Sequence, residues 1–235
     1  MDMTLRMNRA PTPFRKTVSL LASGPLFHES YPGTGTMNGH VADTGQTWGD
    51  GSFLAAGSAA LMTLTGAGEV TSTPQVGGPP FARAAATIVN FNPDGATWTT
   101  VFRIDNDGGP PVNTTLLGNQ EIGLNAEDDY VGFSIFLGGT GGTDAYFSPF
   151  AFANSAAWPS VLLSDFGVNC ALGVEHTVIV QISGLVVTYT YDGVLIFTGS
   201  LTALSAAYNY ILASTEVATG QGFLPYLLDS LIEIP

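Results

Sequence analysis

The sequence predicts an all-β protein, a two-sheet antiparallel sandwich or jelly roll, on three observations. Glycine (29 residues) and proline (14) are frequent, and only 11% of the 235 residues are charged, against ~25% in an average globular domain. Short runs rich in β-branched and aromatic residues recur between turn-forming residues. An Asp192-Gly193 pair separates two such runs, which is the signal of a tight β-hairpin. The many short strands then favour two packed sheets.

The chain begins with a segment that we expect to form a short irregular arm, residues 1–24. Pro11, Pro13 and Gly24 interrupt any strand or helix periodicity there. Residues 25–235 are expected to form one domain, since no repeat or charged linker divides them. The strand-like runs before and after the central hairpins are residues 60–65, 84–91, 98–104, 130–137, 145–153, 208–213 and 227–234.

Residues 175–201 predict a three-strand meander. Val178, Val180 and Ile182 recur at every second position, which gives a strand one buried face. A second run follows Gly184 and a third follows Asp192-Gly193. The Asp-Gly pair favours a type I′ turn, because both central residues of that turn need positive φ.

Charge is divided unevenly between the arm and the rest of the chain. Arg6, Arg9, Arg15 and Lys16 stand beside one acid, so the first sixteen residues carry +3 of a net charge of −13 and the remainder carries −16. So acidic a body repels phosphate backbones, which excludes nucleic-acid binding by the body. No apolar stretch reaches the length of a membrane span, so we expect no membrane contact. The basic arm is expected to attach the protein to a partner.

Three segments carry a resemblance to a known family. They are LFHESYPGTG with GHVADTGQTW near the start, GVEHTVIVQISGLVVTYTYDGVLIFTGSL at residues 173–201, and the closing LLDSLIEI. Together they resemble the concanavalin A-like (lectin/glucanase, laminin-G-like) jelly roll of the kind found in bacteriophage virion proteins. The resemblance implies that the last strand runs beside the first.

Glycosidases of this family would carry a Glu-x-Asp-x-x-Glu strand motif, and the sequence lacks it. Such enzymes need paired carboxylates, one to protonate the leaving oxygen and one to attack or activate water. The nearest cluster contains Glu121, Glu127, Asp128 and Asp129, and we interpret it as a solvated turn before the strand at Tyr130. The sequence therefore predicts no enzyme. A hydrolase or lyase with an unfamiliar site is a third alternative.

Two kinds of binding site deserve consideration. Asp105 and Asp107, two residues apart directly after a strand, could begin a calcium site, although Ca²⁺ needs 6–8 oxygen ligands. No other cofactor is expected. Trp158, Trp98 and Tyr146 are the candidate platforms for a glycan; Trp98 begins a strand, and Trp158 beside Pro159 is the better candidate for exposure.

We therefore expect a non-enzymatic bacteriophage virion structural protein, either a capsid decoration or a tail-associated protein. Its partners would be other virion proteins, reached through the arm, with host surface glycan as a further contact. Surface-decorating proteins are commonly symmetric, so we expect a homo-oligomer. The alternative is a secreted or surface carbohydrate-binding module, located outside the cell or on its surface.

Overall fold

The structure is a computed structural model that describes most of the chain. The described residues are 24–50, 57–72, 81–106, 115–123, 130–138, 144–151, 156–204, 207–215 and 223–235. The expected arm, residues 1–24, therefore lies almost wholly outside them, as do Arg6, Arg9, Arg15 and Lys16.

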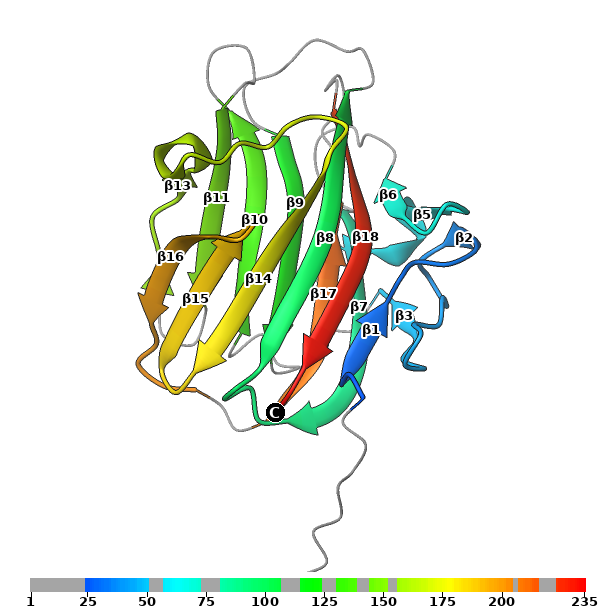
Figure 1. The fold of residues 1–235 in the computed structure, drawn as a ribbon. Helices are drawn as coiled ribbons and strands as arrows, with labels where there is room; N and C mark the ends of the chain where they lie inside the picture. The colour runs from blue at the N-terminus through cyan, green and yellow to red at the C-terminus, as the bar shows by residue number, and fades with distance from the viewer. Residues whose placement is uncertain are drawn as a thin grey trace, which may run out of the picture.

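Two antiparallel sheets pack face to face, which confirms the predicted sandwich (Figure 1). The front sheet has the order β16 (Val194–Ser200), β15 (Val186–Tyr191), β14 (Glu175–Ser183), β8 (Thr97–Asn106), β18 (Phe223–Glu233), β6 (Val70–Ser72), β5 (Met62–Thr65) and β2 (Thr34–Thr36), and β1 (Phe27–Glu29) pairs with β18. The back sheet has the order β12 (Ala156–Ala157), β11 (Asp144–Ala151), β10 (Tyr130–Gly138), β9 (Thr115–Gly123), β17 (Tyr208–Ser214), β7 (Phe81–Phe91) and β3 (Trp48–Gly49).

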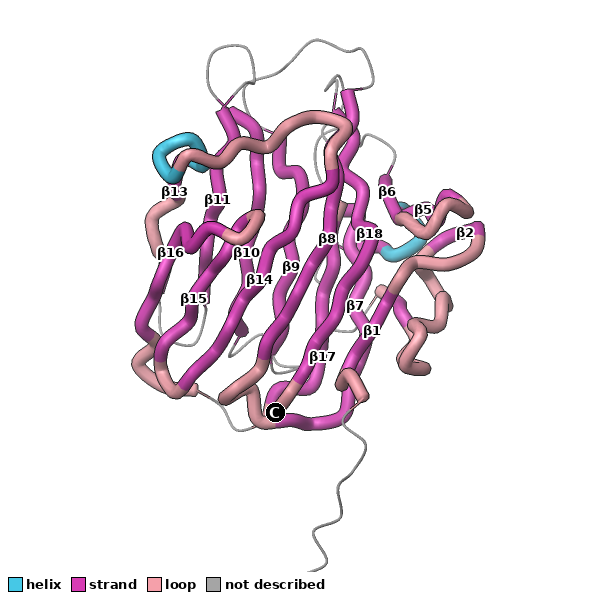
Figure 2. The backbone as a smooth tube through the Cα atoms, viewed as in Figure 1, coloured by secondary structure: helices cyan, strands magenta, loops and turns pink. Residues whose placement is uncertain are grey.

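Short elements complete the sandwich at its edges. β13 (Val161–Leu162) pairs with β11, and β4 (Gly57–Ser58) runs parallel to β7. Two 3₁₀ turns, η1 (Ala59–Leu61) and η2 (Leu163–Phe166), are the helical elements of the described chain (Figure 2). No helix in this part of the chain has the length and apolar character needed to cross a bilayer.

The predicted meander is present as β14, β15 and β16. Asp192 has φ 47° and Gly193 has φ 81°, so both central residues of the hairpin turn have the positive φ that the Asp-Gly pair predicted. β1 pairs antiparallel with β18, with His28 opposite Leu231, so the last strand does run beside the first. The resemblance was therefore right about the closure of the fold.

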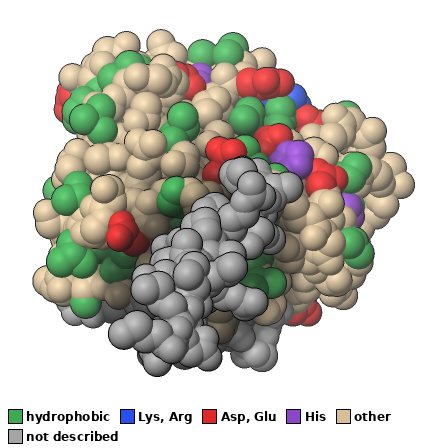
Figure 3. Space-filling model, turned by 60° about the horizontal axis from the view of Figure 1, so that its bottom comes forward, with side chains coloured by type: hydrophobic (Ala, Val, Ile, Leu, Met, Phe, Trp, Pro, Cys, Tyr) green, Lys and Arg blue, Asp and Glu red, His purple; other side chains and the backbone are tan. Residues whose placement is uncertain are grey.

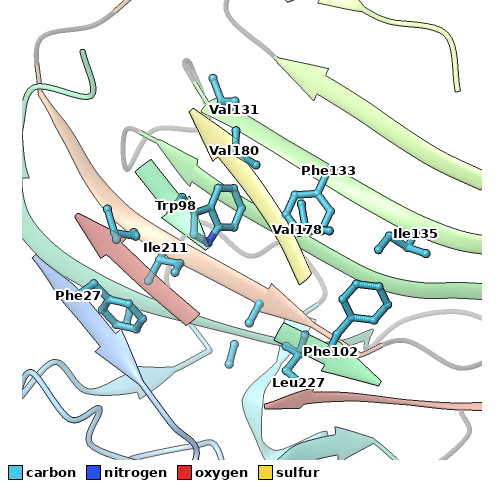
Figure 4. Close-up of a cluster of buried hydrophobic side chains, with 14 of the residues drawn as sticks. Phe27, Trp98, Phe102, Val131, Phe133, Ile135, Val178, Val180, Ile211 and Leu227 are labelled. Carbon is cyan, nitrogen blue, oxygen red and sulfur yellow. The ribbon is translucent and has the colours of Figure 1, made fainter. Parts of the chain in front are cut away.

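The core lies between the sheets and is filled from both (Figure 4). Trp98 of β8 in the front sheet faces Phe133 of β10 in the back sheet, with ring centroids 5.3 Å apart. Phe147 of β11 packs against Tyr189 of β15 in the same way, at 5.5 Å. Each fully buried side chain of this size stabilises the fold by roughly 1.5–3 kcal/mol, so the alternating pattern of the long strands is the main determinant of the sandwich.

Candidate functional site

An N-terminal clasp, residues 26–49, holds a buried polar cluster around Glu29. Glu29 at the end of β1 has no exposed surface, yet its carboxylate accepts hydrogen bonds from the Trp48 indole Nε1 (2.7 Å) and the Tyr31 backbone N–H (2.6 Å). The His40 Nε2 lies 3.2 Å from the same carboxylate. Burial raises the pKa of Glu29 above its ordinary value. A carboxylate so enclosed cannot meet a substrate, so its role is to hold the clasp.

A second histidine connects the surface of the clasp to the front sheet. His28 Nδ1 lies 3.3 Å from Asp43, and its Nε2 lies 3.4 Å from Asp229 of β18. Acidic side chains recur across the face shown in Figure 3, several of them beside histidines. The described residues nevertheless contain no group of three or more His, Cys, Asp or Glu side chains placed to hold a metal ion.

The third histidine is structural as well. His176 is buried between β8 and β15, and its Nδ1 lies 2.7 Å from the Asp192 carboxylate while its Nε2 lies 3.0 Å from the Ala171 carbonyl. Asp192 also accepts a hydrogen bond from the Thr177 backbone N–H at 2.8 Å. The hairpin turn that the sequence predicted is thus fixed to β14 by its own aspartate.

The proposed calcium ligands divide between described and undescribed residues. Asp105 Oδ1 accepts a hydrogen bond from the Arg103 guanidinium at 2.9 Å, and Glu69 occupies the other side of that guanidinium, also at 2.9 Å. The Tyr226 ring lies 4.7 Å from the same group. Calcium would have to displace Arg103 from Asp105. Asp107 lies outside the described residues, so the calcium site stays a prediction.

Two of the three aromatic candidates pack against other aromatic side chains. Trp98 is 1% exposed, because its indole fills the core against Phe133. Trp158 is half-buried at the edge where the two sheets meet: it contacts Phe197 with ring centroids 5.4 Å apart and lies directly over Gly199 of β16. Trp98 is therefore enclosed in the core, whereas Trp158 packs beside Phe197 and keeps part of its surface exposed.

Tyr146 differs from both tryptophans, because it lies on the outer face of the back sheet. Every second residue of β11 is buried toward the core, and the residues between are half-exposed. Tyr146 stacks on Phe136 of β10 with centroids 5.2 Å apart and ring planes 10° from parallel. Tyr130 and Phe150 form an edge-to-face pair further along the same two strands, at 5.9 Å. We call Tyr130, Ser134, Phe136, Tyr146, Ser148 and Phe150 the aromatic face.

A row of polar residues crosses the back sheet between the two aromatic pairs. The strand register aligns one residue from each of five strands, and a loop serine extends the row: they are Arg83, Ser214, Asn119, Ser134, Ser148 and Ser160. Ser160 Oγ donates a hydrogen bond to Ser148 Oγ at 3.1 Å. We call this set the polar row.

The two ends of the polar row differ in exposure. Ser134 and Ser148 on β10 and β11 are half-exposed and stand between the aromatic pairs. Ser214 on β17 is fully buried, and its hydroxyl has no hydrogen-bond partner among the described residues. Buried hydroxyls are nearly always paired, so an unpaired one calls for an explanation. The accessible part of this face therefore lies over β10 and β11.

Glu121 corrects one interpretation made from the sequence. It lies within β9, where it pairs with Gly132 on one side and Leu212 on the other, and not in a solvated turn. Register places Asn119, Glu121 and Gly123 at alternate positions of this strand. The turn interpretation was wrong because β9 gains its stability from two neighbouring strands rather than from a local pattern. Glu127, Asp128 and Asp129 lie outside the described residues.

No protein-family model and no curated protein sequence matches the chain. Solved structures do match the chain. A structure from endo-acting O-glycanases by which the human gut microbiota initiates mucin breakdown has a TM-score of 0.56 at 13% identity, over 90% of this chain and 100% of that one. A pseudo beta-1,3-glucanase and immunostimulatory antigen of Mycobacterium tuberculosis has a TM-score of 0.55 at 12% identity, over 90% and 99%. The carbohydrate recognition domain of Emp46p, in a potassium-bound form, has 0.51 at 12%, over 80% and 88%.

At these identities the likeness establishes the fold, the concanavalin A-like jelly roll, and leaves activity to be argued from the residues. The expectation of a bacteriophage virion protein was wrong. These three neighbours are an O-glycanase structure, a pseudo beta-1,3-glucanase and a carbohydrate recognition domain, and none of the three is a virion protein. The resemblance misled because its motifs determine folding, which virion proteins share with glycan-binding ones.

Proposed function

We propose that this protein is a secreted or cell-surface carbohydrate-binding module that binds its glycan on the aromatic face. One observation carries the proposal: half-exposed rings on β10 and β11 flank the hydroxyls of Ser134 and Ser148. Glycan recognition needs this combination, because a ring covers the apolar face of a sugar while nearby hydroxyls bond to its polar edge. Structural neighbours that include a carbohydrate recognition domain support it.

Binding without hydrolysis is the second part of the proposal. Glycosidases of this fold carry paired carboxylates at alternate positions of one strand. On β9 the alternate positions Asn119, Glu121 and Gly123 offer a single carboxylate. One carboxyl group cannot both protonate the leaving oxygen and attack the sugar, so, within the part of the chain that the structure describes, these residues of β9 favour a binding protein. One neighbour of the same fold is described as a pseudo beta-1,3-glucanase, which supports this part of the proposal.

A glycan array probed with the native chain and two variants tests the proposal. Tyr146→Ala removes one ring of the exposed stacked pair and should weaken the strongest glycan signal by about tenfold. Tyr226→Ala is the matched control, a half-buried tyrosine on the front sheet, and should change the signal less than about twofold. A native chain that binds no glycan, or a Tyr146→Ala variant that binds as well as the native chain, would refute the aromatic face as the site.

Three further expectations stand as proposals beside this one. They are the division into an arm (residues 1–24) and one domain (residues 25–235), attachment to an acidic partner through Arg6, Arg9, Arg15 and Lys16, and homo-oligomeric assembly. Deleting residues 1–24 and measuring folding, mass in solution and partner capture would test all three together. A deleted chain that fails to fold would contradict the domain boundary.

A further inference from the structure

We infer that the aromatic face selects glycans that carry free ammonium groups, with Asp144 as the residue that sets this specificity. The inference rests on the proposed function and names its ligand class. It starts from the position of Asp144, the first residue of β11. Asp144 and Tyr146 are alternate residues of one strand, so both belong to the half-exposed outer face, and their Cα atoms lie about 7 Å apart.

The position opposite Asp144 on the neighbouring strand carries no side chain. Asp144 pairs with Gly138 of β10, which has no side chain, whereas the next outward position on β11, Tyr146, pairs with Phe136. A ligand that stacks on the Phe136–Tyr146 pair therefore brings its substituents next to a carboxylate. That carboxylate is half-buried and belongs to a strand, so its position is fixed by the sheet.

No basic side chain of the described chain stands close enough to neutralise Asp144. Those residues contain two arginines. Arg103 lies in the front sheet, bound to Glu69 and Asp105. Arg83 lies on β7, which β17, β9 and β10 separate from β11, and four strand spacings amount to roughly 19 Å. The strands that carry the aromatic face, β10 and β11, contain no lysine or arginine.

The chemistry of the site then distinguishes three kinds of glycan. Uronic, sialic or sulfated glycans would meet repulsion from Asp144 and from a chain of net charge −13. Neutral glycans would gain only ordinary hydrogen bonds. An amino sugar would place its ammonium group where a carboxylate can accept a charge-assisted hydrogen bond and where the ring of Tyr146 attracts a cation. The carboxylate and the aromatic ring beside it thus each favour the cationic sugar.

The test compares two ligands that share one backbone, a β-linked glucosamine tetramer and its fully N-acetylated form, by calorimetry at low salt. The native chain should bind the glucosamine tetramer about tenfold more tightly, the effect of one hydrogen bond to a charged group. Asp144→Asn should reduce the preference to about twofold or less, because the amide keeps the shape and loses the charge. Asp165→Asn, which changes an exposed acid on η2, should leave the preference intact.

Each outcome is decisive. Equal or tighter binding of the acetylated tetramer, or a preference that persists in Asp144→Asn, would overturn the inference while glycan binding itself stands. Binding of neither tetramer would overturn it as well, and the glycan array described above then decides separately whether the aromatic face binds any glycan. Tyr146→Ala should weaken the binding of both tetramers, and that of the glucosamine tetramer more, because the ring covers the sugar and also attracts its ammonium group.

Discussion

The N-terminal clasp and the aromatic face both combine aromatic and polar side chains, but the two regions differ in how far these side chains are exposed. In the clasp, the Glu29 carboxylate is enclosed and receives donors from Trp48, Tyr31 and His40. On the aromatic face, rings and hydroxyls are half-exposed, and Tyr146 has an aromatic neighbour on one side only among its described ring contacts. Polar groups that are buried and hydrogen-bonded within the protein stabilise the fold, whereas half-exposed polar groups can bind a ligand. The comparison therefore separates residues that would affect stability from residues that would affect binding.

The largest effect is expected from a substitution that disrupts the N-terminal clasp. Glu29→Gln keeps one acceptor oxygen and removes the other, so at least one of the buried donors of Trp48 and Tyr31 loses its partner. We expect the free energy of unfolding in urea to fall by about 3 kcal/mol, the upper end of the cost of leaving a buried hydrogen-bond donor without a partner. Asp165→Asn, an exposed acid, should change it by less than about 0.5 kcal/mol. A Glu29→Gln chain as stable as the native one would mean that the clasp does not hold the fold.

The second prediction, of intermediate size, tests whether Trp158 stabilises the fold or binds glycan. A Cβ added at Gly199 would lie 2.5 Å from the Trp158 ring, so Gly199→Ala must push the indole out of its place. We expect a loss of about 1–3 kcal/mol in the free energy of unfolding with unchanged glycan binding. Gly24→Ala is the control, because nothing lies within 4 Å of its added Cβ. Weakened glycan binding in a stable Gly199→Ala chain would instead show that Trp158 belongs to the glycan-binding surface.

The smallest effect is a pH dependence that sharpens the role of Glu29. Burial raises its pKa above the ordinary 4.5, so the folded chain binds a proton at this carboxyl more readily than the unfolded chain. The stability linked to that proton is full below the ordinary pKa and is lost as the pH rises through the folded value. As the pH falls from 7 to 5, the free energy of unfolding in urea should therefore rise for the native chain relative to Glu29→Gln. Parallel pH profiles for the two chains would contradict a raised pKa.

Local patterns were sufficient wherever one segment determines its own conformation. The Asp192-Gly193 turn, the alternation of Val178, Val180 and Ile182, and the long strands now seen as β8, β10 and β11 were all predicted. β9 was missed, since its sequence TLLGNQEIG lacks regular alternation and its pairing with β10 and β17 joins distant segments. The two-residue strands at the edges were missed for the same reason.

The candidate site was predictable only in part. Tyr146 was named from the sequence as an aromatic residue in a strand, but its partner Phe136 and the polar row depend on register between strands. Trp158 was expected to be exposed because Pro159 follows it, whereas Gly199, some forty residues later, provides the gap that its ring fills. Glu29 gave no signal, because a carboxylate in a short strand ordinarily faces water.

The sequence by itself determined the class of this protein. A low fraction of charged residues, frequent turn formers and alternating runs require strands with one buried face, and strands of that kind pack as a sandwich. Only the tertiary structure decided which aromatic rings remain at the surface and which carboxylates are enclosed. Side-chain exposure depends on which distant segments lie opposite one another, and that is set by strand register across the sheets rather than by any local run of residues.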